Sequence, residues 1–233
     1  MTVKHTQSIT CLACGQPSDF DFYASINTLF DPALKQRVKN FDIFKFICPH
    51  CGSEQFVAYS LLYHQMEDKL MIYCVQDEDD IASVRKLFDE DFSSVVDETG
   101  RQRALDTVAY RRRIVVGADS LVEKLRIFDA GLDDRLMEIY KILLYGQMQP
   151  QLAEMPGGDD VESLYVDEAL DHSLSLVFVA DGQGIGAVPF DRAAYDHIAS
   201  QYSSALEQAT ADDLLIDQDW AFDFLAQAAQ AQG

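Results

Sequence analysis

The sequence lacks long hydrophobic runs, since no segment approaches the roughly 18 consecutive apolar residues that a membrane-spanning helix needs. We therefore expect no membrane association. The first ten residues, MTVKHTQSIT, also lack the apolar stretch of a secretory signal, which predicts a cytoplasmic protein. Phosphate-binding loops, serine nucleophile elbows and paired-histidine zinc motifs are absent too, so no common catalytic signature indicates an enzyme.

Positive charge is scarce towards the end of the chain. The net charge is −21, and residues 150–233 contain 16 acidic side chains but a single basic one, Arg192. Residues 1–65 hold five of each sign. Such a negative field repels phosphate backbones, so we expect no nucleic acid as a main ligand. The acidic region is either a solubilising surface or a docking face for a basic protein partner, and the sequence leaves the oligomeric state open.

Only five cysteines occur, but four of them form two matching motifs. Cys11 and Cys14 precede a glycine, Cys48 and Cys51 precede another, and 33 residues separate the two pairs. Two thiolates two residues apart can bind one side of a metal ion, and the glycine permits the tight turn that directs backbone N–H groups at sulfur. Two such turns complete a closed tetrahedral site. The pattern therefore predicts one structural Zn²⁺ in a zinc ribbon.

Other uses of these cysteines are less consistent with the pattern. A thioredoxin-like redox site needs one C-x-x-C motif rather than two, and structural disulfides are disfavoured in the cytosol. His5 and His50 are spare ligands if a cysteine is not used, although four thiolates already fill the shell. Cys74 alternates with apolar residues in MIYCV and is predicted to be buried in a strand.

These motifs and three longer blocks resemble the CpXC domain family of bacterial and archaeal proteins over about residues 9–145. The blocks are SINTLFDPALKQRV between the cysteine pairs, LLYHQMEDKLMIYCV after the second pair, and RIVVGADSLVEKLRIFDAGLDDRLMEIYK further on. The first pair departs from the family by carrying Leu12 and Ala13 in place of proline, but neither position supplies a ligand. The resemblance implies a zinc-binding domain and no particular activity.

The periodicity predicts an α+β fold with an N-terminal zinc-ribbon β unit, added strands and helices, and an acidic α+β region at the end. Alternation favours strands at residues 8–14, 18–26, 41–48, 55–64, 69–75 and 110–116. Asp31 and Pro32 predict a short helix over 31–39. A longer helical segment covers 119–148, with Ser120 and Glu123 as a capping box and Gly131 as a break.

The domain boundary is predicted within QPQLAEMPGGDD, which gives a CpXC-like domain at 1–149 and the acidic region at 150–233. The acidic region reads as three strands and two helices. Its glycines Gly182, Gly184 and Gly186 precede Pro189 and not a helix, so they favour a hairpin over a nucleotide-binding loop. Neither His172 nor His197 has an evident nucleophile beside it.

Two functions remain open. The first is an interaction module without catalytic activity, in which zinc is structural. The alternative is an enzyme whose polar site combines the arginine run Arg111–Arg113 with the charged helix residues Glu123–Arg135, with zinc as a scaffold. Three consecutive strand residues cannot share a face, and charges at helical spacing usually form surface i,i+4 pairs, so both segments also have a purely structural explanation. Nucleic-acid binding through the ribbon is a third, weaker hypothesis.

Overall fold

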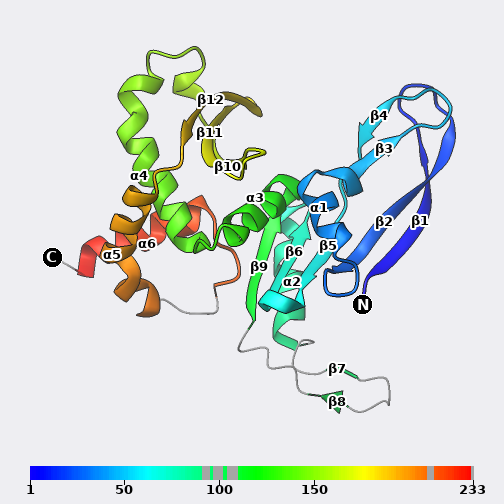
Figure 1. Cartoon of the computed structure of the whole chain (residues 1–233), viewed down its shortest axis with the longest axis horizontal. Coiled ribbons are helices and arrows are strands. Elements are labelled where there is room, and N and C mark those ends of the chain that lie inside the picture. Colours follow the sequence, from blue (N-terminus) through cyan, green and yellow to red (C-terminus); the bar gives the residue numbers. More distant parts are fainter. Residues whose placement is uncertain (91–94, 97–101, 104–109, 209–212, 232–233) are drawn as a thin grey trace. The chain divides into compact units, whose positions relative to one another are not determined.

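The computed structural model has a mixed α+β fold, as predicted, and describes residues 1–90, 95–96, 102–103, 110–208 and 213–231. The chain forms two units, unit 1 at Met1–Val122 and unit 2 at Glu123–Gly233. Figure 1 shows the elements of each unit. A continuous helix, Asp134–Leu152, crosses residues 149/150, where the sequence predicts the domain boundary, and that boundary stays a prediction.

Unit 1 is built on a five-stranded sheet in the order β1-β2-β5-β6-β9. Its strands are β1 (Val3–Thr10), β2 (Pro17–Asn27), β5 (Leu61–Gln65), β6 (Leu70–Val75) and β9 (Arg111–Val116). Neighbours β1/β2 and β5/β6 are antiparallel, whereas β2/β5 and β6/β9 are parallel. The central strands supply a buried apolar core that includes Ile26, Leu61, Tyr63, Ile72 and Ile114.

The predicted ribbon is an extension of this sheet. β2 pairs with β5 only through Ser25–Asn27, so the remainder of the β1–β2 hairpin projects beyond the sheet. A small antiparallel pair, β3 (Lys45–Ile47) and β4 (Glu54–Phe56), lies near the free end of that hairpin in Figure 1. The connection to β3 contains the helix α1 (Ala33–Lys39), which confirms the helix predicted at 31–39, and the short turn η1 (Asp42–Phe44).

Three predicted strands differ in their bounds from the structure. Of the strand predicted at 41–48, only β3 (Lys45–Ile47) forms, since Asp42–Phe44 are the turn η1. The first strand covers Val3–Thr10 and not the predicted 8–14. Its residues are exposed on both faces, so no apolar alternation in the sequence marks its extent. The segment expected as one strand at 55–64 is divided into β4 and β5, which belong to different sheets. The turn η2 (Met66–Asp68) joins β5 to β6.

Helices follow the second half of the sheet. The turn η3 (Glu78–Asp80) leads into α2 (Ile81–Glu90), and β7 (Val95–Val96) pairs with β8 (Gln102–Arg103). The helix α3 (Gly117–Asp129) begins three residues before Ser120, so the predicted capping box does not form. Gly131 does end the helical segment, since its φ of 69° is left-handed.

Unit 2 packs helices with a three-stranded antiparallel sheet. Its elements are the end of α3, α4 (Asp134–Leu152), η5 (Gly158–Asp160), β10 (Ser163–Glu168), β11 (Leu174–Ala180), β12 (Gln183–Pro189), α5 (Arg192–Gln208) and α6 (Gln218–Ala231). The predicted hairpin at Gly182 is confirmed, because β11 and β12 flank it. Among the described residues, no helix combines the length and the apolar character that crossing a bilayer requires.

Candidate metal centre

The two cysteine motifs form turns with the same backbone hydrogen bonds. The Cys11 N–H donates to the Gln16 carbonyl at 3.0 Å, and the Gly15 N–H donates to the Cys11 carbonyl at 2.8 Å. In the second motif the Cys48 N–H donates to Ser53, and Gly52 donates to Cys48, both at 2.9 Å. Each glycine is left-handed, with φ of 71° at Gly15 and 72° at Gly52. The glycines are therefore needed for backbone conformation, as the sequence predicts.

The turns bring all four sulfurs into one cluster. The Sγ atoms of Cys11, Cys14, Cys48 and Cys51 lie within 4.8 Å of one another. Two pairs that cross between the turns, Cys11 with Cys51 and Cys14 with Cys48, are each separated by 3.7 Å. Four sulfurs at about 2.3 Å from a tetrahedral Zn²⁺ would be about 3.8 Å apart. The donor set and its spacing therefore fit a single metal ion, and the four residues could hold it.

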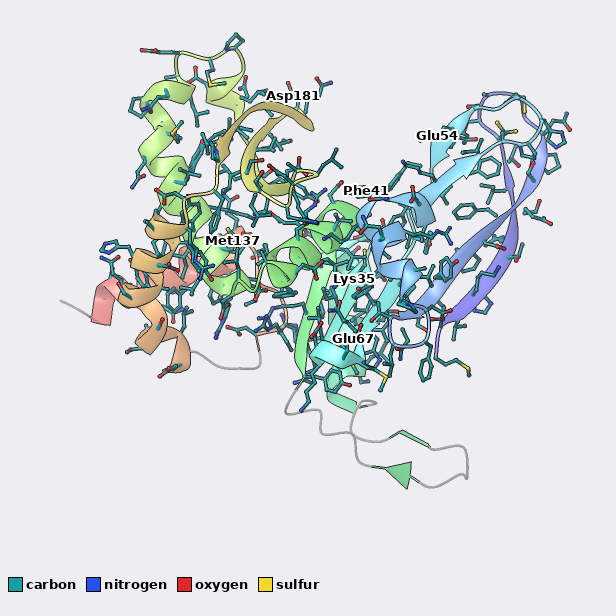
Figure 2. All side chains as sticks on the ribbon, viewed as in Figure 1. Lys35, Phe41, Glu54, Glu67, Met137 and Asp181 are labelled. Carbon is teal, nitrogen blue, oxygen red and sulfur yellow. The ribbon has the colours of Figure 1, made fainter. Side chains whose placement is uncertain are left out.

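One cysteine of each pair is buried and the other is exposed. Cys11 and Cys48 are 1% exposed and pack with the rings of Phe20 and Phe46, whereas Cys14 and Cys51 face outward. Figure 2 shows sulfur atoms in yellow at this end of unit 1, near the labelled Glu54. Within the described part of the chain the buried ribbon core is small, and Ile9, Phe22, Val57 and Tyr59 are the partly buried apolar side chains that pack against it. A bound metal ion would therefore supply much of the free energy that stabilises this end of unit 1.

Both spare histidine ligands lie outside the cluster. Neither His5 nor His50 belongs to the group of metal-competent side chains found among the described residues. The His5 ring instead contacts Phe22, with 5.5 Å between ring centroids. The fifth cysteine is buried in β6, as predicted, and burial raises the pKa of the Cys74 thiol to about 12. Cys74 is thus a protonated core side chain that is separate from the metal centre.

Backbone donors favour a thiolate within the cluster. The Cys14 N–H lowers the pKa of Cys11 to about 7. The Ser53 N–H acts in the same direction on Cys51, but desolvation and the neighbouring thiols outweigh it and raise the pKa of Cys51 to about 12. Four thiols so close together cannot all ionise without a counter-charge, and a divalent cation supplies one.

The arginine run does not form a convergent site. Along β9, Arg111 is exposed, Arg112 is half-buried and Arg113 is buried, so the three side chains do not share one environment. The Arg112 guanidinium donates to the Phe88 carbonyl at 3.1 Å and lies over the Phe88 ring. Arg113 is 6% exposed and donates to the carbonyl of Arg112. These contacts attach β9 to its surroundings in unit 1.

The charged helix residues Glu123–Arg135 include side chains that are buried, which the sequence does not predict. They were expected to form i,i+4 pairs on a surface, but Glu123 and Lys124 are buried. Lys124 Nζ lies 2.9 Å from Glu138 Oε1 and 3.5 Å from Asp134 Oδ2. Lys141 Nζ lies 2.7 Å from Glu123 Oε1 and 3.0 Å from Glu138 Oε2. Five ionisable side chains of α3 and α4 thus form one network, which we call the buried charge network.

The network also reaches the sheet of unit 2. The Val166 N–H in β10 donates to Glu123 Oε1 at 2.7 Å. Desolvation raises the pKa of Glu123, whereas for Glu138 the two lysines overcome desolvation and hold the pKa below its usual value. The nearby arginines point elsewhere, since Arg126 pairs with Asp167 and Arg135 with Asp133. The network is enclosed by protein, and its chemistry is that of a structural ion cluster.

Sequence reasoning missed Glu138 and Lys141. Their one available signal was their position, because they interrupt the otherwise apolar stretch Leu136–Leu144 of a helix whose other residues read as core. Charged residues within an apolar stripe are expected to be paired when buried.

Fold and site together define a protein with a zinc-ribbon-like unit and a four-cysteine cluster that could hold a metal ion. The model of the CpXC protein family matches residues 9–141, which is more than half of the chain. The chain therefore belongs to the CpXC family, as its resemblance predicted. No match was found among curated proteins or among solved structures.

Proposed function

We propose that Cys11, Cys14, Cys48 and Cys51 bind one structural Zn²⁺, and that the protein is a cytoplasmic interaction module without catalytic activity. The sulfur cluster supports the first part, since four cysteines in two matching turns leave no open coordination position for a substrate. Zinc suits an all-thiolate tetrahedral site better than the harder cations do. The metal then acts by fixing the ribbon and not by activating water.

Elemental analysis of the purified full-length protein tests the metal. We expect one zinc per chain, and we expect Cys48→Ser to lose most of it. Cys74→Ala is the matched control, because it removes a buried thiol that lies outside the cluster. Zinc retained at full stoichiometry by Cys48→Ser, or absent from the native chain, would contradict the proposal.

The acidic region supports the choice of partner. Residues 150–233 carry 16 acidic side chains and one basic one, and that one, Arg192, pairs with Asp196 at 2.8 Å. The region would therefore attract a basic protein and repel nucleic acid. Several acidic side chains, among them Asp171 and Asp181, are exposed and available for such an encounter.

Salt dependence tests this partner. Pull-downs from the native lysate at low and high salt should recover a basic protein that dissociates as ionic strength rises through the screening range. A matched bait that carries Asp159→Asn, Asp160→Asn and Glu162→Gln should bind the basic partner more weakly. A tight partner that survives high salt unchanged would contradict electrostatic docking, and nanomolar binding of DNA or RNA at physiological salt would contradict the exclusion of nucleic acid.

A further inference from the structure

The strand β1 is an open edge of the sheet in unit 1. Among the described strands it stands first in the order and pairs with β2 alone, over its whole length from Val3 to Thr10. Seven of its eight residues are exposed, and only Ile9 is partly buried. Figure 1 shows β1 along the outer side of the projecting hairpin. Its second row of backbone groups has no strand partner among the described residues.

The hydrogen bond at the first cysteine turn identifies which backbone groups are open. The Cys11 N–H donates to the Gln16 carbonyl, so that pair is a hydrogen-bonded pair of the ladder. Such pairs alternate with non-bonded ones, which means that Ile9, Gln7 and His5 also direct their backbone groups at β2. The backbone groups of Thr10, Ser8, Thr6 and Lys4 consequently point away from β2. Pro17, which has no N–H, faces Thr10 in a non-bonded pair, as this assignment requires.

β1 carries little of the usual protection of an edge strand. Edge strands commonly carry charged side chains, above all lysine, or proline, or a bulge that twists them away. Residues 1–18 contain no acidic side chain, in a chain of net charge −21, and the one charged residue of β1, Lys4, pairs with Asp21 at 2.7 Å. The register shift at Val3/Lys4 places the extra residue on β2, because Val3 faces Ser25 while Lys4 faces Tyr23. β1 itself therefore stays regular.

We propose that β1 pairs with β1 of a second copy of this chain, antiparallel and centred on Thr6. Two edges can pair only if their open residues face each other, and this register places Thr6 opposite Thr6 and Lys4 opposite Ser8 of the other copy. The closed residues then form the non-bonded pairs, with Val3 facing Ile9. A Thr–Thr pair and an apolar pair both favour strand association, and no like charges meet. The two five-stranded sheets become one continuous sheet.

The size of this contact sets the expected strength. A single strand pair is a small interface, below the standard size of stable complexes, so the dimer should form reversibly at about micromolar concentration or above. Each copy also carries a net charge of −21, so general repulsion opposes association. Added salt screens that repulsion and should strengthen the dimer, which is the opposite of the salt dependence expected for a basic partner.

Sedimentation of the zinc-loaded full-length chain tests the proposal. We expect a concentration-dependent dimer whose fraction increases between low and moderate salt. Ser8→Pro removes an outward N–H from each copy and no donor from the β1–β2 ladder, and should weaken dimerisation at least about tenfold. Ser8→Ala keeps the backbone and should dimerise normally. A monomer at every concentration and salt, or a dimer that Ser8→Pro leaves unchanged, would overturn the proposal.

Amide hydrogen exchange in the wild-type chain is the second measurement, and it does not depend on how Ser8→Pro folds. The His5, Gln7 and Ile9 amides should be protected at all protein concentrations, since they bond to β2. The Lys4, Thr6 and Ser8 amides should exchange quickly in dilute protein and become protected as the dimer forms. Equal behaviour of the two sets at every concentration would also overturn the proposal.

Discussion

Removing the proposed zinc should unfold the ribbon end of unit 1 and leave the rest of its sheet folded. The ribbon end comprises the two cysteine turns, the β3–β4 pair and the part of the β1–β2 hairpin that extends beyond the contact with β5. An isolated two-stranded hairpin is marginally stable in water. The central strands are different, because β5, β6 and β9 share an extensive buried core.

The free energies involved indicate that the folding of the ribbon end depends on the metal. The ribbon core contains two well-buried aromatic side chains, Phe20 and Phe46. Burying each stabilises by about 1.5–3 kcal/mol, so the pair contributes roughly 3–6 kcal/mol. Ordering the backbone costs about 1–2 kcal/mol per residue, so the two rings offset the ordering of only a few residues. A structural Zn²⁺ contributes roughly 10–16 kcal/mol, which is several times the contribution of the two rings.

Hydrogen–deuterium exchange with and without a chelator measures this effect by segment. Peptides covering residues 9–22 and 45–57 should lose protection when zinc is removed, whereas 61–75 and 111–116 should keep theirs. Cys48→Ser should reproduce the pattern without chelator, and Cys74→Ala should not. Unchanged exchange in the ribbon after zinc removal would refute the reasoning. Equal loss across β5, β6 and β9 would refute the claim that the sheet is independent of the metal.

The remaining predictions concern the buried charge network and the glycines. Glu138→Gln should lower the free energy of unfolding at neutral pH by about 3–5 kcal/mol, because it leaves buried lysines without a full partner; Arg192→Ala, in an exposed pair, should cost at most about 1 kcal/mol. Glu123→Gln should cost less than Glu138→Gln, because the pKa of Glu123 is raised while that of Glu138 is lowered. A carboxyl group with a lowered pKa in the folded state stabilises the fold at pH values above its unfolded pKa of about 4.3, and this stabilisation is lost as the pH falls through the folded pKa. The free energies of unfolding of the two variants should therefore converge in acid, which denaturant unfolding at several pH values measures. Gly52→Ala should destabilise the zinc-loaded ribbon by about 1–2 kcal/mol through its φ of 72° alone, since nothing lies near the added carbon, while Gly146→Ala within α4 should be neutral or stabilising in the same melt.

The sequence predicted the cysteine cluster fully, because its determinants are local. Two residues between thiols and a following glycine fix the geometry of each turn, and both turns adopt it. The cluster needed only one long-range event, the meeting of the two turns. The small β unit, α1 and the break at Gly131 follow from equally local signals, namely alternation, a proline at a helix start and a left-handed residue.

Strand boundaries were harder to predict because they depend on pairing partners. β1 is exposed on both faces, so its side chains carry no periodic signal, and its existence depends on the ladder with β2. The stretch at 55–64 alternates as though it were one strand. Its first part pairs with β3 in the ribbon and its last part with β6 in the main sheet, and no local pattern reports that change.

The buried charge network shows a different limit. Helical spacing correctly places Glu123 and Lys124 on a helix, but burial depends on what packs against that helix. α4 and β10 supply the partners through Glu138, Lys141 and the Val166 N–H. Charges at helical spacing are compatible with both an exposed ladder and an internal cluster, so the tertiary fold decides between them.

The metal centre and the open edge are physically linked. Cys11 follows β1 directly, so the cysteine turns fix one end of the β1–β2 hairpin, and the pairing of β2 with β5 fixes the other. If zinc removal frees the first end, the open groups of Thr6 and Ser8 lose their regular spacing, and the proposed self-pairing weakens with them. Linkage is reciprocal, so self-pairing must then tighten zinc binding by the same factor. The metal would thus strengthen self-association without contacting the second copy, because it keeps β1, the strand that makes the contact, regular.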